Sequence, residues 1–133
     1  MNRDLFREQY LAELEGMKKA KILLHRNQVL NRSEEAATTA MKIDLISNVS
    51  DLFEKFIAGQ KEEISREELQ RNFLEELDTY YKKIDDRNSE FLKIRDYKSS
   101  FKLTVAMEEI DELKNHLDRY LNLIEGVRED ADI

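Results

Sequence analysis

The fold is decided by the stretch LTVAMEEIDELKNHLDRYLNLIEGV at residues 103–127. Apolar residues recur there every seven positions in two interleaved series, Leu103, Ile110, Leu117 and Ile124, and Ala106, Leu113, Tyr120 and Val127. Two apolar positions per heptad form the seam along which one α-helix packs against another in a coiled coil. The stretch therefore predicts a long helix that has a helical neighbour along its length.

The segment before it carries a second seam. Its start is marked by ISREEL at residues 64–69, which has the spacing of a capping box and of a hydrophobic staple, with Ser65 as N-cap. A helix beginning at Arg66 then has apolar residues at heptad spacing, namely Phe73, Leu77, Tyr80, Ile84, Phe91 and Ile94. Arg87 occupies the skipped seam position, where we expect it to reach water or to pair with a facing acid.

No proline or glycine separates these two seams, yet they are out of phase. Extending the earlier seam predicts apolar residues at 98, 101, 105 and 108, whereas the later seam begins at Leu103 and Ala106. That shift turns the apolar face by about 200° at 3.6 residues per turn, which one straight helix cannot present to one core. Ser99 and Ser100 are suited to cap a new helix, so we predict a turn there. A continuous helix over residues 66–127 is the alternative.

Residues 1–58 add two more amphipathic segments, each with apolar residues at helical spacing. The first covers about residues 3–30, with its stripe on Phe6, Tyr10, Leu14, Met17 and Leu24. The second starts near Asn31 or Ser33 and runs to about residue 58, with its stripe on Ala37, Met41, Leu45, Leu52, Phe53 and Phe56. Gly59 stands where helices commonly end, and residues 59–63 form a short polar linker.

The composition supports the same class. With 0 Pro, 3 Gly and 38% charged residues, the chain matches long helices and coiled coils. Its hydrophobic share of 41% separates it from disordered chains, which cannot bury enough apolar surface. We predict an all-α fold, an elongated antiparallel helical bundle of about four long helices with coiled-coil-like seams. Residues 1–128 form its single domain, and residues 129–133 form a frayed acidic C-terminal tail.

Several classes of protein are excluded. The chain has 0 Cys, so it has no disulfide framework, no thiolate metal site and no cysteine nucleophile. Its longest apolar run, Ile22-Leu23-Leu24, is far shorter than the ~18 to 20 residues of a membrane span. The N-terminal residues MNRDLFREQY are charged where a signal peptide needs an apolar core. We therefore expect a soluble, intracellular, cytoplasmic protein that retains its N-terminus.

Catalytic and metal-binding motifs are scarce. The sequence has no glycine-rich phosphate loop and no Gly-x-Ser-x-Gly motif. The histidines, His25 and His116, lack the Glu-x-x-His spacing of helical di-iron sites, because Ile22 and Leu113 stand where the glutamates would be. We predict no catalytic residue, no metal site and no cofactor.

Two acid pairs, Glu75-x-x-Asp78 and Glu108-x-x-Asp111, each place two carboxylates on one helical face. The arrangement resembles the magnesium sites of all-α nucleotide pyrophosphatases of the MazG type. That resemblance implies a magnesium-dependent enzyme acting on nucleotides. The family's first motif has a further glutamate three residues after its acid pair, whereas the pair at residues 67–68 is followed there by arginine. A magnesium-dependent nucleotide pyrophosphatase is therefore an alternative to a non-enzymatic function.

Charge is distributed unevenly along the chain. The net charge is −7, yet residues 1–32 hold seven Lys and Arg against four Asp and Glu, while residues 99–133 hold four against nine. Such a chain lacks the concentrated basic face that direct nucleic-acid binding requires. The acids of the last segment form a candidate partner-binding face of Glu108, Glu109, Asp111, Glu112, Asp118 and Glu125.

Long helices that expose so much side-chain surface favour a non-enzymatic protein–protein interaction module, such as an adaptor, a chaperone-like binder, an assembly subunit or an inhibitor. The expected partner is another protein with a basic or helical surface, and self-association is a further possibility. An acidic inhibitor that occupies the nucleic-acid-binding cleft of its target is an alternative. The basic first segment and the acidic last segment could also pair within the chain, and the charge asymmetry would then serve the fold alone.

Overall fold

The computed structural model describes the backbone of residues 2–131 and the side chains of residues 2–119. Over this range the chain forms four α-helices, α1 (Arg3–Asn31), α2 (Ser33–Ala58), α3 (Arg66–Lys93) and α4 (Tyr97–Ala131). Helix accounts for about 90% of the described residues. The described residues contain no strand, only an isolated bridge between Asn2 and Glu63. The predicted all-α helical bundle is confirmed.

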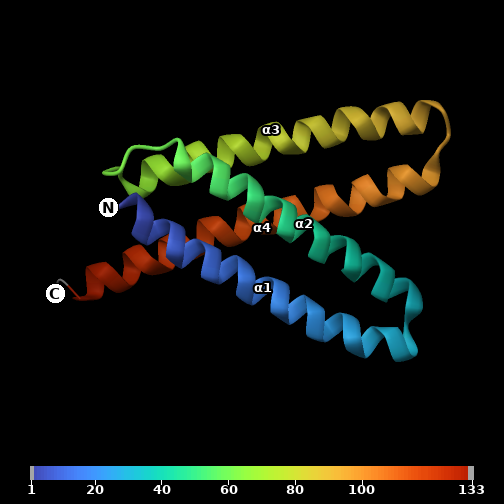
Figure 1. Cartoon of the computed structure of the whole chain (residues 1–133), viewed down its shortest axis with the longest axis horizontal. Coiled ribbons are helices and arrows are strands. Elements are labelled where there is room, and N and C mark those ends of the chain that lie inside the picture. The colour runs from blue at the N-terminus through green and yellow to red at the C-terminus, as the bar shows by residue number, and fades with distance from the viewer. Residues whose placement is uncertain (1, 132–133) are drawn as a thin grey trace.

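The helices are arranged as two antiparallel hairpins, α1 with α2 and α3 with α4 (Figure 1). The hairpins are held together mainly by packing of α2 against α4. In Figure 1 the four helices come together toward the left, whereas the α1–α2 and α3–α4 turns lie far apart at the right. We call these two regions the closed end and the open end of the bundle.

The closed end contains an aromatic cluster contributed by three helices. Tyr10 of α1 lies edge-on to Phe53 of α2, with ring centroids 4.8 Å apart. Phe53 in turn meets Phe73 of α3 at 5.1 Å and 88°. Edge-to-face aromatic pairs contribute about 0.5–1.5 kcal/mol beyond the area that they bury. The fourth helix completes this core with three fully buried residues, Ile110, Leu113 and Leu117.

The link between the hairpins, residues 59–65, is tied to the N-terminus. The backbone N–H of Arg3 donates to the Glu62 carbonyl at 2.9 Å. The Arg3 guanidinium donates to the Gln60 carbonyl at 2.8 Å. Ser65 accepts a hydrogen bond from the backbone N–H of Glu68 at 3.1 Å, so it caps α3 as predicted. These bonds fix the start of α1 beside the start of α3.

The turn between α3 and α4 lies at residues 94–96, earlier than predicted. The N–H of Asp96 donates to the Phe91 carbonyl at 2.9 Å and that of Arg95 donates to the Leu92 carbonyl at 3.1 Å, which is the Schellman pattern. Arg95 has a positive φ of 60°. The prediction of two separate helices is correct. The position was wrong because arginine occupies the left-handed site where glycine usually marks a helix end.

The residue that caps α4 is Asp96. Its carboxylate accepts hydrogen bonds from the backbone N–H of Ser99 at 3.2 Å and from the Ser99 hydroxyl at 2.7 Å. Ser100, the other predicted cap, is buried within the helix. The α4 helix extends to Ala131, beyond residue 129 where the acidic tail was expected to begin. Residues 132 and 133 lie outside the described part of the chain.

Several predicted seam residues are not in the core. Leu24 is 49% exposed and Ile94 is 72% exposed, and both lie near the open end, where the two hairpins have separated. Ala37 is also exposed. In the seam of α3, the buried residue after Ile84 is Asn88, which is 8% exposed, and not Arg87, which lies at the surface. The side chains of Tyr120, Ile124 and Val127 are outside the described range.

No helix in the described range combines the length and the apolar character needed to cross a membrane.

Candidate functional site

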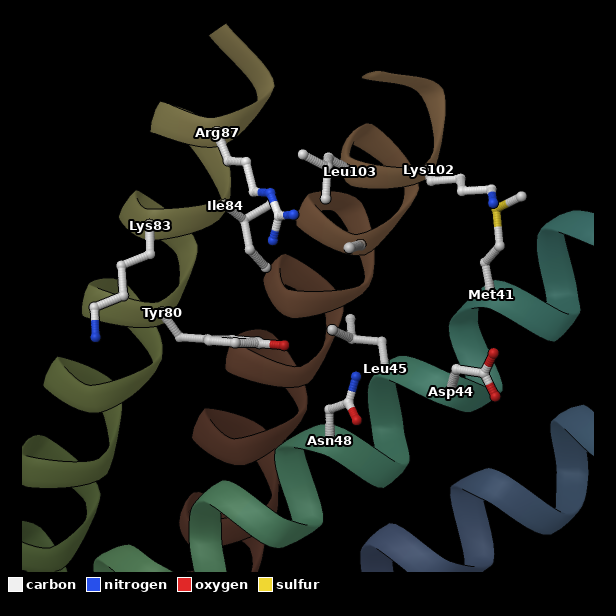
Figure 2. A pocket seen from close by; sticks show the side chains of 11 residues that line it. Met41, Asp44, Leu45, Asn48, Tyr80, Lys83, Ile84, Arg87, Lys102 and Leu103 are labelled. Atoms are coloured by element: carbon white, nitrogen blue, oxygen red, sulfur yellow. The ribbon is translucent and has the colours of Figure 1, made fainter. Parts of the chain in front are cut away.

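A groove lies between the two hairpins where they diverge, with walls from α2, α3 and α4 (Figure 2). Its volume is about 420 Å³. Its floor is mostly apolar, formed by Met41, Leu45, Tyr80, Ile84, Leu103 and Ala106. We call it the inter-hairpin groove.

Heptad periodicity explains the apolar floor. Ile84 of α3 and Leu103 of α4 are seam positions, the kind that a neighbouring helix covers in a closed bundle. Here the hairpins diverge, so both side chains are only half-buried. Leu45 of α2, by contrast, is buried in the core beneath them. The seams thus continue beyond the point where the helices can cover one another.

The rim of the groove is mainly cationic. Figure 2 shows the Arg87 guanidinium over the groove beside Ile84 and Lys102 extending from α4 toward α2. Lys83 also lines the groove, but its side chain extends away along α3. Within the part of the chain that the structure describes, none of these three cations forms an ion pair. Asp44 is the one acid in the lining, so the mouth is positive in a chain of net charge −7.

Arg87 makes one further contact, with its guanidinium carbon 5.8 Å from the centroid of the Phe91 ring. This distance suits a cation–π interaction. Arg87 was predicted to reach water or pair with an acid. It is exposed to solvent, and an aromatic ring rather than an acid lies beside it. The ring supports the guanidinium and leaves its N–H groups available at the mouth of the groove.

Tyr80 places a polar group in the floor, with its ring directed across the groove toward Asn48 in Figure 2. Burial raises the pKa of the Tyr80 hydroxyl above its ordinary value of 10.0, and a hydrogen bond with Asn48 partly opposes this shift. The hydroxyl is therefore neutral at physiological pH. It provides a hydrogen-bonding group in an otherwise apolar floor.

A second groove of about 640 Å³ adjoins the start of α4 on the side of α1. Its lining includes Leu24 of α1 and Phe101 of α4, and Phe101 is 53% exposed. Phe101 and Lys102 are consecutive, so the first turns of α4 contribute to both grooves. Apolar surface is therefore exposed on two sides of the open end.

Glu109, predicted as a partner-binding residue, is fully buried at 0% exposure. Its carboxylate lies 3.3 Å from the ammonium of Lys21 in α1 and 4.0 Å from that of Lys42 in α2. Burial raises the pKa of Glu109 to about 7, with Lys21 opposing the shift and Glu112 adding to it. This residue connects three helices and is not part of an exposed face.

The other predicted acids are divided among different surroundings. Glu112 approaches Lys21 at 3.9 Å, and Asp118 accepts a hydrogen bond from Gln70 of α3. Glu108 and Asp111 are exposed, while the side chain of Glu125 is outside the described range. The six acids therefore do not share one free face. Lys21 of the basic first segment lies near Glu109 and Glu112 of the acidic last segment, so part of the charge asymmetry is neutralised within the chain.

The acid pairs that suggested a magnesium site do not converge. Asp78 pairs with Lys114 of α4 rather than with another carboxylate. Among the described residues, no three Asp, Glu or His side chains are grouped so as to hold a metal ion. His116 contacts Glu13 of α1 at 3.0 Å. This histidine therefore takes part in the packing of α4 against α1.

Comparison of the chain with protein-family models, curated protein sequences and solved structures finds no match. What the groove can bind is therefore inferred from the chemistry of its own side chains. The sequence did not single out Lys102 or Asn48 as functional residues. The only signal for the groove was the continuation of both seams through Ile84 and Leu103.

Proposed function

We propose that this protein is a non-enzymatic interaction module that receives a helix of another protein in the inter-hairpin groove. The observation that carries the proposal is the incomplete burial of seam residues in the groove floor. Ile84 and Leu103 have the spacing of residues that pack against a helix, yet the described helices leave both side chains only half-buried. A partner helix would complete the bundle at its open end.

The walls of the groove favour a helical occupant over an extended one. An extended segment needs backbone partners, which it usually finds at the edge of a sheet. The walls here are helices whose backbone groups bond within themselves. A helix satisfies its own backbone and can present apolar residues at i, i+3 or i+4, and i+7 to the floor.

The binding energy would come from apolar burial. Full burial of a leucine- or phenylalanine-sized side chain contributes about 1.5–3 kcal/mol. A partner helix would bury its own anchors and also the exposed parts of Ile84, Leu103 and Met41. Phe101, exposed on the adjoining groove, could extend the contact. Exposed apolar surface of this kind is characteristic of interaction sites.

The proposal predicts that cross-linking will be specific to the groove. A photoreactive residue at position 84 should form one defined adduct with a protein of the native host, whereas the same residue at the exposed position 92, outside the groove, should not. The adduct is identified by mass spectrometry, and the partner is then purified. Ile84→Asn should weaken binding of the purified partner by about tenfold or more, because it places an amide against the apolar anchors.

Leu92→Asn is the matched control, since Leu92 is an exposed apolar residue of the same helix that does not line the groove. Circular dichroism establishes that both variants are folded. Equal binding by Ile84→Asn and the wild type would overturn the proposal. So would magnesium-dependent turnover of nucleoside triphosphates that Asp78→Asn abolishes, which would instead establish the pyrophosphatase alternative.

A further inference from the structure

Building on the proposed function, we infer that the helix received by the inter-hairpin groove carries acidic residues on both sides of its apolar stripe. The feature that indicates this is the position of Arg87 and Lys102 on different walls of the groove, α3 and α4, with the apolar floor between them (Figure 2).

Neither cation is neutralised by the fold. Arg87 contacts a ring and Lys102 has no ion-pair partner within the described residues. Asp85, Asp86 and Glu90 are near Arg87 in the sequence, but all three are exposed to solvent, where salt screens their charge, and none lines the groove. An occupant therefore meets a local positive potential, although the net charge of the chain is −7.

The chemistry of the two cations specifies carboxylates. A guanidinium presents a planar fork of N–H donors that matches a carboxylate, and the Phe91 ring holds that of Arg87 at the mouth. Lys102 supplies a second charge on another wall. In a helix with apolar residues at a and d, the flanking e and g positions would lie beside these walls. Glutamates at e and g would therefore meet both cations.

The inference contrasts with the basic partner expected from the sequence. A basic helix would bring like charges together over a low-dielectric floor, which is costly at an interface. Asp44, the acid in the lining, turns its carboxylate away from α3 and does not offset Arg87. The groove therefore selects against a basic occupant, and it does so with residues other than the six acids predicted as the partner-binding face.

The test uses labelled synthetic helices of about three heptads. All have leucine at a and d, and they carry glutamate, glutamine or lysine at e and g. Fluorescence anisotropy measures their binding to the full chain at low and high salt. We expect the glutamate helix to bind tightest, with an advantage that shrinks as salt is added. In Arg87→Glu/Lys102→Glu, its affinity should fall by at least about tenfold and that of the lysine helix should rise.

The control is Lys82→Glu/Lys98→Glu, which changes the net charge equally on the same two helices. Both lysines are exposed and neither lines the groove, so binding should change by less than about twofold. Equal binding of the three helices, or loss of affinity in the control as large as in the groove variant, would overturn the inference. So would displacement of the glutamate helix by a single-stranded oligonucleotide, which would assign the cations to phosphate.

These outcomes are separate from failure of the proposed function. If the glutamine or lysine helix binds tightest and Ile84→Asn abolishes that binding, the groove still receives helices and only the acidic chemistry is wrong. If no helix is bound, or if Ile84→Asn leaves binding unchanged, the groove is not a helix-docking site and both proposals fail.

Discussion

Glu109 is the residue whose surroundings differ most from the prediction. A carboxylate moved from water into a protein interior loses hydration, and ion pairs offset that cost only when their geometry is good. The two ammonium groups that approach Glu109 do so at 3.3 and 4.0 Å, and neither carboxylate oxygen accepts a regular hydrogen bond from a described residue. Desolvation therefore exceeds the attraction of the lysines and raises the pKa of Glu109 to about 7.

This shift makes the stability of the fold dependent on pH. The pKa of Glu109 is about 7 in the folded protein against 4.5 ordinarily, so the unfolded chain releases this proton first as the pH rises. The stabilisation is complete below about pH 4.5 and is lost as the pH rises toward 7. We expect the free energy of unfolding to fall by up to about 3 kcal/mol across this range, and Glu109→Gln to remove the fall. Urea denaturation at a series of pH values measures both.

Glu108→Gln is the matched control, because Glu108 is the exposed neighbour of the buried carboxylate. It should keep the wild-type dependence on pH. If Glu109→Gln also keeps it, other groups are responsible for the dependence and Lys21 and Lys42 are sufficient to hold Glu109 ionised.

The α3–α4 turn illustrates how a helix can end without a glycine. The two Schellman hydrogen bonds require a left-handed residue, and Arg95 adopts that conformation with φ of 60°. For a residue with a Cβ atom this costs roughly 1–2 kcal/mol. The Asp96 cap, with two hydrogen bonds to Ser99, offsets part of that cost by stabilising the next helix.

Arg95→Gly should therefore stabilise the protein. Relief of the left-handed conformation favours the folded state, while the greater freedom of glycine in the unfolded chain opposes it by about 0.4–1 kcal/mol. The expected net gain in the free energy of unfolding is on the order of 0.5–1 kcal/mol, measured by urea or thermal denaturation. Lys93→Gly, in the last turn of α3, should instead lose about 0.5–1 kcal/mol. Destabilisation by both variants would contradict the strain at Arg95.

The core of the bundle and the proposed docking site lie in different regions. The largest fully buried side chains come from the parts of the four helices that meet at the closed end. They are Phe6, Tyr10, Leu14, Ile46, Phe53, Ile57, Leu69, Phe73, Leu77, Ile110, Leu113 and Leu117. Toward the open end each hairpin is supported mainly by its own two helices (Figure 1). The separation allows a partner to be received without opening the core.

Amide hydrogen exchange should follow this division, because local opening requires least energy where few apolar side chains are buried. We expect the slowest exchange in residues 45–57, 69–77 and 110–117. Exchange should be faster in residues 22–40 and 88–104, although both regions are helical apart from Arg32 and the turn at residues 94–96. Uniform protection along all four helices would show that the two ends unfold together. Binding of a partner helix should slow exchange at the open end selectively.

The fold class and the packing of the closed end follow from local sequence. Heptad spacing identified Ile110, Leu113 and Leu117 as core residues, and the capping box placed the start of α3 at its true position. These features are predictable because helical periodicity and capping depend on residues three to seven positions apart. Local sequence patterns thus predict an all-α bundle and the apolar face of each helix.

Where those apolar faces are covered depends on how the four helices pack against one another. The divergence of the hairpins leaves Ile84 and Leu103 only half-buried in a groove, and the crossing of α1, α2 and α4 buries Glu109 between Lys21 and Lys42. Neither outcome is encoded in the periodicity of one helix, because helix–helix angles depend on how side chains of separate elements interlock. The positive charge at the mouth of the groove could not be predicted for the same reason. Arg87 and Lys102 come to line one groove only when α3 and α4 pack together.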